Sequence, residues 1–533
     1  MKKIFLSVAL LAAAVAPAFA GGLLTNTNQN AAYVRQMSQN GIIDITGLYA
    51  NPAGTAFLTN GWHLSLDIQT AKQQRNIETS FPLFALNQGD NNATHRFEGK
   101  AFAPVIPSFQ LSYNKDKWSV NANFALVGGG GKCEFDKGLG SFEALYAGQM
   151  YQQVPAAVNA LVSQQVGAAL PGMVQGQVSQ ALVGMGIPQN YANMIASTTQ
   201  TNYNVGSQMK GYNLDAFMKG RSYYFGLQIG GTYKFTENLA GFVGLRGIYA
   251  TCNYNGYVQD VQANYAYKVN YDYTVPVNAQ LGFPGTNGTG ELSDTGVQPL
   301  NENTLTLNAD QTGFGVSATI GLDWKINEHW NLAGKYEAPT KMMLKNKSEM
   351  NNFAQAQIAA GNATLGKFAD GAKVREDIPG ILALGAQYSP VSCVRINAGF
   401  NAYFDKSAKK TALDAATGKL AEIKGAGIDK NTWEVNGGVE WDVCKYITLS
   451  ASYQNTNYGI ADDGMTDLSF NLSNQMVGAG LRINATERCN IDLGYMHTFY
   501  DDRTVTTSTA AGPKVDNYVR KNDVFGVGVN IAF

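Results

Sequence analysis

The sequence predicts an all-β membrane protein, a fourteen-stranded antiparallel outer-membrane β-barrel with an N-terminal hatch and a helical extracellular loop. Three observations support this fold class: long alternating segments, scarce charges and abundant glycine. Of the 533 residues, 45% are hydrophobic, only 15% are charged and 58 are glycine. This mixture excludes a disordered chain. A net charge of −1 also gives no electrostatic footprint for nucleic acid.

The alternation is clearest over residues 314–324, where every second residue is apolar and the residues between are small or polar. It recurs over 394–404, 477–484 and 525–533. Successive side chains of a strand point to opposite faces, so each strand has one apolar face. A soluble sandwich would also alternate, but its strands usually have about 5 or 6 residues. The longer segments, with few charges on their polar faces, favour a barrel with lipid outside.

Fourteen alternating segments can be counted, and an even number is typical of a bacterial outer-membrane barrel. The predicted strands are 61–80, 98–114, 117–131, 221–236, 239–258, 311–325, 329–347, 373–389, 392–406, 430–443, 445–459, 466–484, 488–504 and 517–533. Short turns alternate with long connections along this series. We expect the short turns on the periplasmic side and the long loops outside the cell.

The first 20 residues match a secretory signal peptide. Lysines precede an apolar stretch over 4–15, and residues 18–20 (Ala-Phe-Ala) form an A-x-A cleavage site. An uncleaved membrane anchor is the alternative, but the apolar stretch is short and ends in small residues. We therefore expect the mature chain to begin at Gly21 and to leave the cytoplasm for the bacterial outer membrane.

Residues 21–58 precede the first strand and do not alternate. They contain Asp44 and the run Asn51-Pro52-Ala53-Gly54. A segment with no place in the wall is either a periplasmic tail or a plug inside the lumen. Its apolar residues favour packing over disorder. We expect a hatch over 21–58, followed by the transmembrane barrel over 59–533.

The long extracellular loop over 132–220 is unusual because residues 144–209 include no charged residue. Prolines interrupt apolar residues at helical offsets, which predicts a pair of helices that begin at prolines. The apolar stripe comprises Val158, Leu161, Val162, Val174, Val178 and Leu182. An uncharged helical pair could be a docked lid, a surface that captures hydrophobic ligands, or the tip of an adhesin.

The chain resembles the FadL/TodX-type outer-membrane transporters of long-chain fatty acids and other hydrophobic compounds. The resemblance rests on Asp44 and Asn51-Pro52-Ala53-Gly54 before strand one, Asp377-Ile378-Pro379-Gly380, Tyr336-Glu337-Ala338-Pro339 and Asn490-Ile491-Asp492-Leu493-Gly494-Tyr495. It implies a hatch-plugged barrel of fourteen strands. It also implies that a ligand is caught at the outer loops, passes to an apolar pocket above the hatch and leaves sideways at a kinked third strand.

Strand three ends in Gly128-Gly129-Gly130-Gly131, a run that removes side chains from the wall and tolerates bends. With the resemblance, this run is either a lateral opening or its hinge, or a flexible start to the long loop, and the two interpretations have equal support. The resemblance also favours ligand capture by the apolar stripe. The family's basic ligand-binding residues have no motif match here. Arg395, Arg482 and Lys234 face the lumen and could pair with a carboxylate, although such residues line many wet barrels.

The leading hypothesis is uptake of long-chain fatty acids or similar hydrophobic molecules by a monomer in contact with outer-membrane lipid. A surface adhesin or structural barrel is one alternative, and an open porin for small hydrophilic solutes is another. No GxSxG motif or acid–base pair indicates an enzyme. Five widely spaced cysteines and four scattered histidines form no metal pattern, so neither a cofactor nor a metal is expected.

Overall fold

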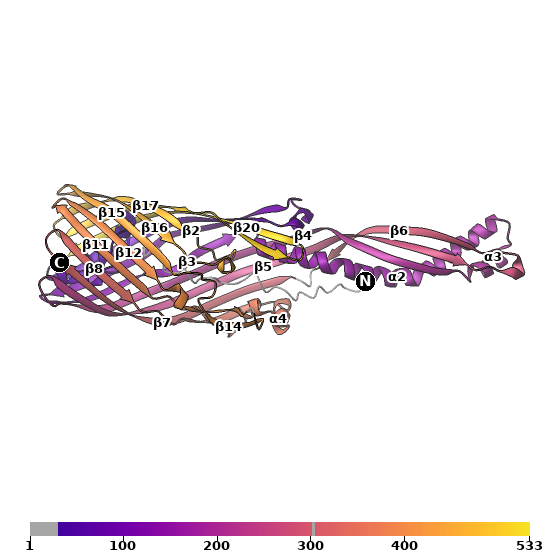
Figure 1. The fold of residues 1–533 in the computed structure, drawn as a ribbon, viewed down its shortest axis with the longest axis horizontal. Helices are drawn as coiled ribbons and strands as arrows, with labels where there is room; N and C mark the ends of the chain where they lie inside the picture. Colours follow the sequence, from indigo (N-terminus) through magenta and orange to yellow (C-terminus); the bar gives the residue numbers. More distant parts are fainter. Residues whose placement is uncertain (1–29, 301–303, 415) are drawn as a thin grey trace.

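The structure, a computed structural model, describes residues 30–300, 304–414 and 416–533 (Figure 1). Within them, a sheet of eighteen strands closes on itself because β1 (Gly61–Ser80) pairs along its length with β20 (Gly512–Ala532). Neighbouring wall strands are antiparallel throughout. The signal peptide predicted for residues 1–20 lies outside the described residues.

The closed wall has fourteen strands within the described residues, which confirms the predicted fold class. β8 and β9 form one interrupted strand because both pair with β7, and β10 likewise leads into β11. β6 and β19 extend hairpins beyond the ring. The wall strands are β1, β2 (Thr94–Lys115), β3 (Trp118–Phe135), β4 (Gln200–Lys234), β5 (Leu239–Val275), β7 (Leu305–Lys325), β8 (Trp330–Glu337) with β9 (Met343–Met350), β10 (Lys373–Arg375) with β11 (Ile381–Val391), β12 (Val394–Tyr403), β15 (Thr432–Cys444), β16 (Ile447–Asn457), β17 (Asn474–Thr486), β18 (Cys489–Tyr500) and β20.

The remaining elements lie in the lumen or beyond the wall. The other strands are β6 (Thr286–Pro299), β13 (Lys409–Asp414), β14 (Lys419–Lys424) and β19 (Arg503–Thr509). The α-helices are α1 (Ala31–Arg35), α2 (Gly140–Gly184), α3 (Gln189–Ala196), α4 (Asn352–Ala359) and α5 (Ala363–Gly366). The 3-10 helices are η1 (Ile45–Gly47), η2 (Pro52–Phe57), η3 (Pro82–Leu86), η4 (Ala279–Leu281), η6 (Asp405–Ser407) and η7 (Asp462–Gly464).

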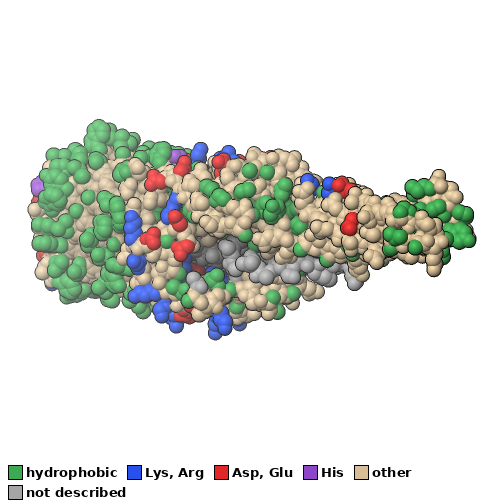
Figure 2. Space-filling model, turned by 45° about the vertical axis from the view of Figure 1, so that its right-hand side comes forward, with side chains coloured by type: hydrophobic (Ala, Val, Ile, Leu, Met, Phe, Trp, Pro, Cys, Tyr) green, Lys and Arg blue, Asp and Glu red, His purple; other side chains and the backbone are tan. Residues whose placement is uncertain are grey.

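The apolar faces of the wall strands point away from the lumen. On β7, for example, Ile320 and Leu322 are more than half exposed, whereas Thr319 and Asp323, which flank this pair, are fully buried. Figure 2 shows the outward apolar side chains as a broad band around one end of the molecule. Such a band is the lipid-facing belt of an outer-membrane barrel. None of the described helices is long and apolar enough to cross a membrane.

A long extension, called here the spike, projects from the end opposite the apolar band (Figure 1). It consists of the outer parts of β4 and β5 together with β6, α2 and α3. β4 has 35 residues and β5 has 37, so both run well beyond the predicted 221–236 and 239–258. With 45 residues, α2 is about 68 Å long at 1.5 Å per residue.

The spike contains one continuous helix, α2, where the sequence predicted two. Pro155 and Pro171 lie inside it. Each proline removes a helical hydrogen bond, but the apolar stripe of α2 packs on β4 and β5 across both sites. This packing overrides the local preference to end the helix. The side of α2 that faces the sheet carries an apolar residue at every fourth position, a series that includes the stripe residues other than Leu161: Val154, Val158, Val162, Val166, Leu170, Val174, Val178 and Leu182.

Candidate functional site

Residues 30–58, called here the hatch, lie inside the barrel and are almost entirely buried. α1 packs against β17, β18 and β20, and η2 packs against the opposite part of the wall. Lumen-facing glycines make this contact possible. A Cβ at Gly494 would lie 2.6 Å from the Arg35 nitrogen, and one at Gly526 would lie 2.9 Å from the Ala31 Cα. Glycine lets two backbones approach this closely, so part of the glycine excess serves hatch docking.

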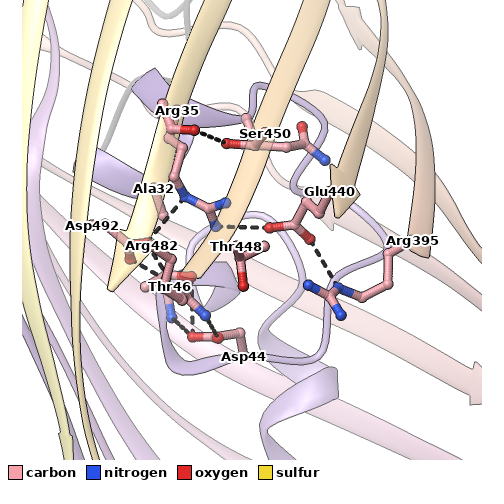
Figure 3. A network of polar contacts seen from close by, with 12 residues as sticks. Ala32, Arg35, Asp44, Thr46, Arg395, Glu440, Thr448, Ser450, Arg482 and Asp492 are labelled. Carbon is pink, nitrogen blue, oxygen red and sulfur yellow. Dashed lines mark hydrogen bonds and ion pairs between the residues drawn. The ribbon is translucent and has the colours of Figure 1, made fainter. Parts of the chain in front are cut away.

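Ion pairs join the hatch to the wall (Figure 3). Arg35 of α1 lies 2.8 Å from Glu440 and 3.0 Å from Asp492. Arg482 of β17 lies 2.8 Å from Asp492 and extends to Asp44 at 2.6 Å. Arg35, Glu440 and Asp492 are all buried. Because a buried charge is strongly destabilising without its partner, these pairs favour the docked position of the hatch.

Asp44, singled out from the sequence, caps η1 and forms the hatch end of this network. Its carboxylate accepts hydrogen bonds from the Thr46 N–H at 2.9 Å and the Thr46 hydroxyl at 3.1 Å. Burial alone would raise the pKa of Asp44, but the Arg482 guanidinium and the Thr46 N–H hold it below its usual value. The ionised form of Asp44 is therefore the one that tethers the hatch.

The run Asn51-Pro52-Ala53-Gly54 begins η2 and contacts the wall at Asp323. The Asn51 side chain accepts a hydrogen bond from the Gly54 N–H at 3.2 Å and donates to the Ile42 carbonyl at 3.2 Å. The same amide donates to the Asp323 carboxylate. Pro52 occupies the first position of η2, where its missing N–H costs no hydrogen bond.

We expect Asn51→Ala or Pro52→Ala to disturb transport more than barrel assembly. Asn51→Ala removes the cap and one donor to Asp323, which loosens the hatch without touching the wall ladder. The measurement is uptake of a hydrophobic tracer beside the fraction of heat-modifiable, folded barrel. Asn60→Ala is the matched control, because the side chain of Asn60 bonds Asp116 at an exposed turn and no other residue of the described chain. Normal uptake in both hatch variants would contradict the prediction.

The wall is open between β2 and β3. The two strands pair from the short turn up to Phe109 and Phe124, and pair again at Lys100 and Glu134. Between these points, residues 101–108 of β2 have no ladder partner on β3 within the described chain. This lateral gap interrupts the hydrogen-bonded ladder between two neighbouring strands of the wall.

Local sequence on both strands explains the gap. Pro104 and Pro107 of β2 have no N–H to donate to a ladder. On β3, Gly129 and Gly131 adopt positive φ angles of 106° and 67°, which other residues rarely adopt. A Cβ at Gly129 would also lie 2.3 Å from the Ser222 carbonyl oxygen. The prolines and the glycine bulge therefore hold the two strands apart.

A cavity of about 460 Å³ passes through the lateral gap. Its lumen side includes Arg75 and Arg520, and its wall includes Gly128–Gly131. On the lipid side it includes Phe102 and Val105, both 60% exposed. The cavity thus connects the lumen above the hatch with the outer surface of the apolar band.

The two arginines of the cavity form no ion pair within the described residues. Arg75 is buried, bonds Gln73 at 2.6 Å and donates weakly to the Gly130 carbonyl at 3.4 Å. Arg520 donates to Asn471 at 3.2 Å. Neither arginine was among the residues singled out from the sequence. The alternation along β1 could have identified Arg75, since it places this side chain on the face of the strand that points into the lumen.

The predicted site residues fall into separate places. Asp44 and Asn51–Gly54 lie in the hatch, and Gly128–Gly131 lie at the lateral gap. In the predicted capture stripe, Val158, Val162, Val174, Val178 and Leu182 are buried in the core of the spike, and Leu161 is half-buried. The capture role of this stripe stays a prediction. With the stripe packed in this way, a ligand would reach it only if α2 moved away from the sheet.

The basic residues considered from the sequence are mostly engaged. Arg395 lies 2.7 Å from Asp442 and 3.4 Å from Glu440, and Arg482 belongs to the hatch network. Lys234 lies 5.4 Å from the centre of the Phe57 ring. Two of these three cations are therefore neutralised by acids of the barrel and the hatch.

Comparison with solved structures identifies the fold. A Pseudomonas aeruginosa FadL homologue superposes with a TM-score of 0.55 at 13% sequence identity, covering 96% of this chain and 100% of that chain. The P. putida toluene transporter TodX matches at 14% identity and a TM-score of 0.46, over 91% of this chain and 93% of its own. The Ralstonia pickettii toluene transporter TbuX matches at 12% identity and a TM-score of 0.45, over 92% and 94%. Neither a protein-family model nor a curated protein matches the sequence.

Proposed function

Since the chain has the fold of a FadL-type outer-membrane barrel, we propose that it is an uptake channel for hydrophobic molecules, with long-chain fatty acids as the favoured class. The observation that carries this proposal is the cavity through the lateral gap between β2 and β3. A molecule in the lumen could pass through this cavity into the membrane without crossing the hatch.

The lateral route suits an apolar substrate for a physical reason. Moving each CH₂ group from water into an apolar medium is favourable by about 0.8 kcal/mol. A route that ends among Phe102 and Val105 delivers the chain into lipid instead of the aqueous periplasm. The docked hatch closes the straight path, so the energy of partitioning drives the molecule sideways. In this scheme, the loops beyond the barrel capture the molecule, and Gly128–Gly131 provide the lateral opening.

The two arginines of the cavity favour a carboxylate over a neutral hydrocarbon. A buried guanidinium without an acid partner is costly, and a carboxylate would accept strong hydrogen bonds from it. Arg75 and Arg520 both line the cavity, and neither has an acid partner among the described residues. An uncharged hydrocarbon would leave both cations unpaired. We therefore assign them to the headgroup of a fatty acid on its way to the gap.

This assignment is tested with Arg75→Met and Arg520→Met, alone and together. We expect the double variant to take up a labelled long-chain fatty acid at least tenfold more slowly. Uptake of a neutral hydrocarbon tracer should stay within twofold of the normal rate. Arg96→Met is the matched control, because Arg96 lies in an exposed pair with Glu98, 3.4 Å away. If the double arginine variant took up both tracers equally slowly, carboxylate binding by the two arginines would be contradicted. The lateral route has its own test: normal uptake of both tracers by Gly130→Phe would contradict it.

A further inference from the structure

Directly beyond the apolar band, exposed lysines gather on one side of the barrel. β9, β10, β13 and β14 lie next to one another there: β10 pairs with β9, a bridge joins residues 376 and 410, and β13 pairs with β14. Figure 2 shows Lys and Arg side chains collected along the boundary where the apolar band ends. Four lysines on these strands, Lys345, Lys373, Lys409 and Lys424, are called here the lysine belt. All four are exposed.

The lysine belt contains two pairs of like charges placed directly opposite each other. Lys345 and Lys373 are cross-strand partners in the β9–β10 ladder. Lys409 and Lys424 are cross-strand partners in the β13–β14 hairpin. Like charges in directly opposite positions are destabilising. An anion bound between the lysines would reduce the repulsion within each of these two pairs.

Two acids beside the belt lysines pair with an arginine instead. Asp377 lies 2.9 Å and Glu422 lies 2.8 Å from the guanidinium of Arg375. None of the four belt lysines forms an ion pair with an acid of the described chain. The four belt lysines are thus exposed cations that are free to pair with an anion from outside this molecule.

The height of the belt matches the headgroup layer of the membrane. Lys345 lies opposite Thr312 on β7, and Phe314, two residues nearer the band, is 64% exposed and lipid-facing. Two residues of a strand span about 7 Å, so the belt begins within one headgroup thickness of the apolar band. The spike leaves the barrel on this same side, which makes it the outer leaflet.

We propose that the lysine belt binds the phosphate groups of the phosphorylated glycolipid, lipopolysaccharide, in the outer leaflet. This proposal rests on the outer-membrane location that the proposed function assumes. Ammonium groups donate short, charge-assisted hydrogen bonds to phosphate oxygens. Neighbouring lysines can also share one phosphate, which removes the repulsion within each pair. The bound glycolipid would fix the rotation of the barrel relative to its lipid neighbours and anchor the side that carries β13 and β14.

The test uses the full mature chain, purified free of glycolipid and titrated with purified lipopolysaccharide in detergent. We expect K345Q/K373Q/K409Q/K424Q to bind at least tenfold more weakly than the unaltered chain. The control K115Q/K117Q/K325Q/K445Q makes the same change of charge at exposed lysines of the short turns and should bind normally. Arginine at all four belt positions should retain binding, which separates loss of charge from loss of folding.

Further titrations identify the source of the phosphate. Dephosphorylated lipopolysaccharide should bind the unaltered chain as weakly as intact lipopolysaccharide binds the glutamine variant. Equal binding by the glutamine variant and the control would overturn the proposal. Displacement of lipopolysaccharide by millimolar inorganic phosphate, or equal preference for phosphatidylglycerol vesicles, would also overturn it. Fatty-acid uptake into proteoliposomes should be normal in the glutamine variant, so failure here is distinguishable from failure of the proposed function.

Discussion

Gly130→Phe is expected to lower uptake of a hydrophobic tracer at least tenfold while the barrel still folds. A Cβ at Gly130 would meet only the tip of the Arg75 side chain, at 3.2 Å. The backbone of Gly130 is not in the left-handed region, unlike Gly129 and Gly131, so the substitution adds little strain. The ring would instead occupy the cavity of about 460 Å³ and displace Arg75 from it.

The control for this variant is Gly437→Phe, which puts the same ring on the lipid-facing side of β15. There a Cβ would lie 3.6 Å from the nearest atom, the Asn397 carbonyl oxygen, so the site has room. Uptake rate and heat-modifiability are measured for both variants. A folded Gly130→Phe barrel that transports at the normal rate would rule out the lateral gap as the exit.

The second large effect is expected for Arg35→Met, which should convert a closed barrel into a conducting one. The change leaves Glu440 and Asp492 with one cation fewer in a buried network. Breaking a buried ion pair by removing one partner usually costs about 3–5 kcal/mol. Arg35 is the one charged residue of α1, so the lost interaction energy weakens the docking of the hatch. The hydrogen-bonded ladder of the wall is not affected.

Single-channel recording in planar bilayers measures this effect directly, and sensitivity to large hydrophilic antibiotics measures it in cells. Adding Glu440→Gln to Arg35→Met should restore part of the closed state, since one uncompensated acid is removed. Arg96→Met again serves as a control, because an exposed ion pair contributes about 1 kcal/mol or less. An Arg35→Met barrel with unchanged conductance would show that the network does not hold the hatch.

The wall was predictable from the sequence because period-two alternation is a local property. Within the membrane each strand must present apolar side chains to lipid, so the alternation shows directly which residues form the strand. The predicted boundaries of β4, β5 and β17 were wrong, for two different reasons. β4 and β5 continue far beyond residues 221 and 258, where lipid no longer imposes alternation on the outer face. β17 begins at Asn474 instead of 466, because the apolar residues before it form part of the buried core beyond the wall.

The site was less predictable because it depends on register between distant strands. The glycine run on β3 was visible, and so were Pro104 and Pro107 on β2. Only their pairing shows that the two breaks face each other. Likewise, α1 brings Arg35 beside Glu440 and Asp492, which no spacing along the chain indicates. Alternation can assign a side chain to the lumen, but it cannot say which charges will meet there.

The spike also places part of this protein far from the barrel (Figure 1). α2 starts beside the end of β1, where a Cβ at Gly140 would touch the Thr79 side chain, and runs about 68 Å outward from there. In the orientation that the proposed function requires, a particle or antibody approaching from outside would therefore contact this protein far from the mouth of the barrel. The length of the spike depends on α2 and on the strands beside it. Shortening α2 together with the facing parts of β4, β5 and β6 would move this point of contact toward the barrel by about 5.4 Å for each helical turn removed.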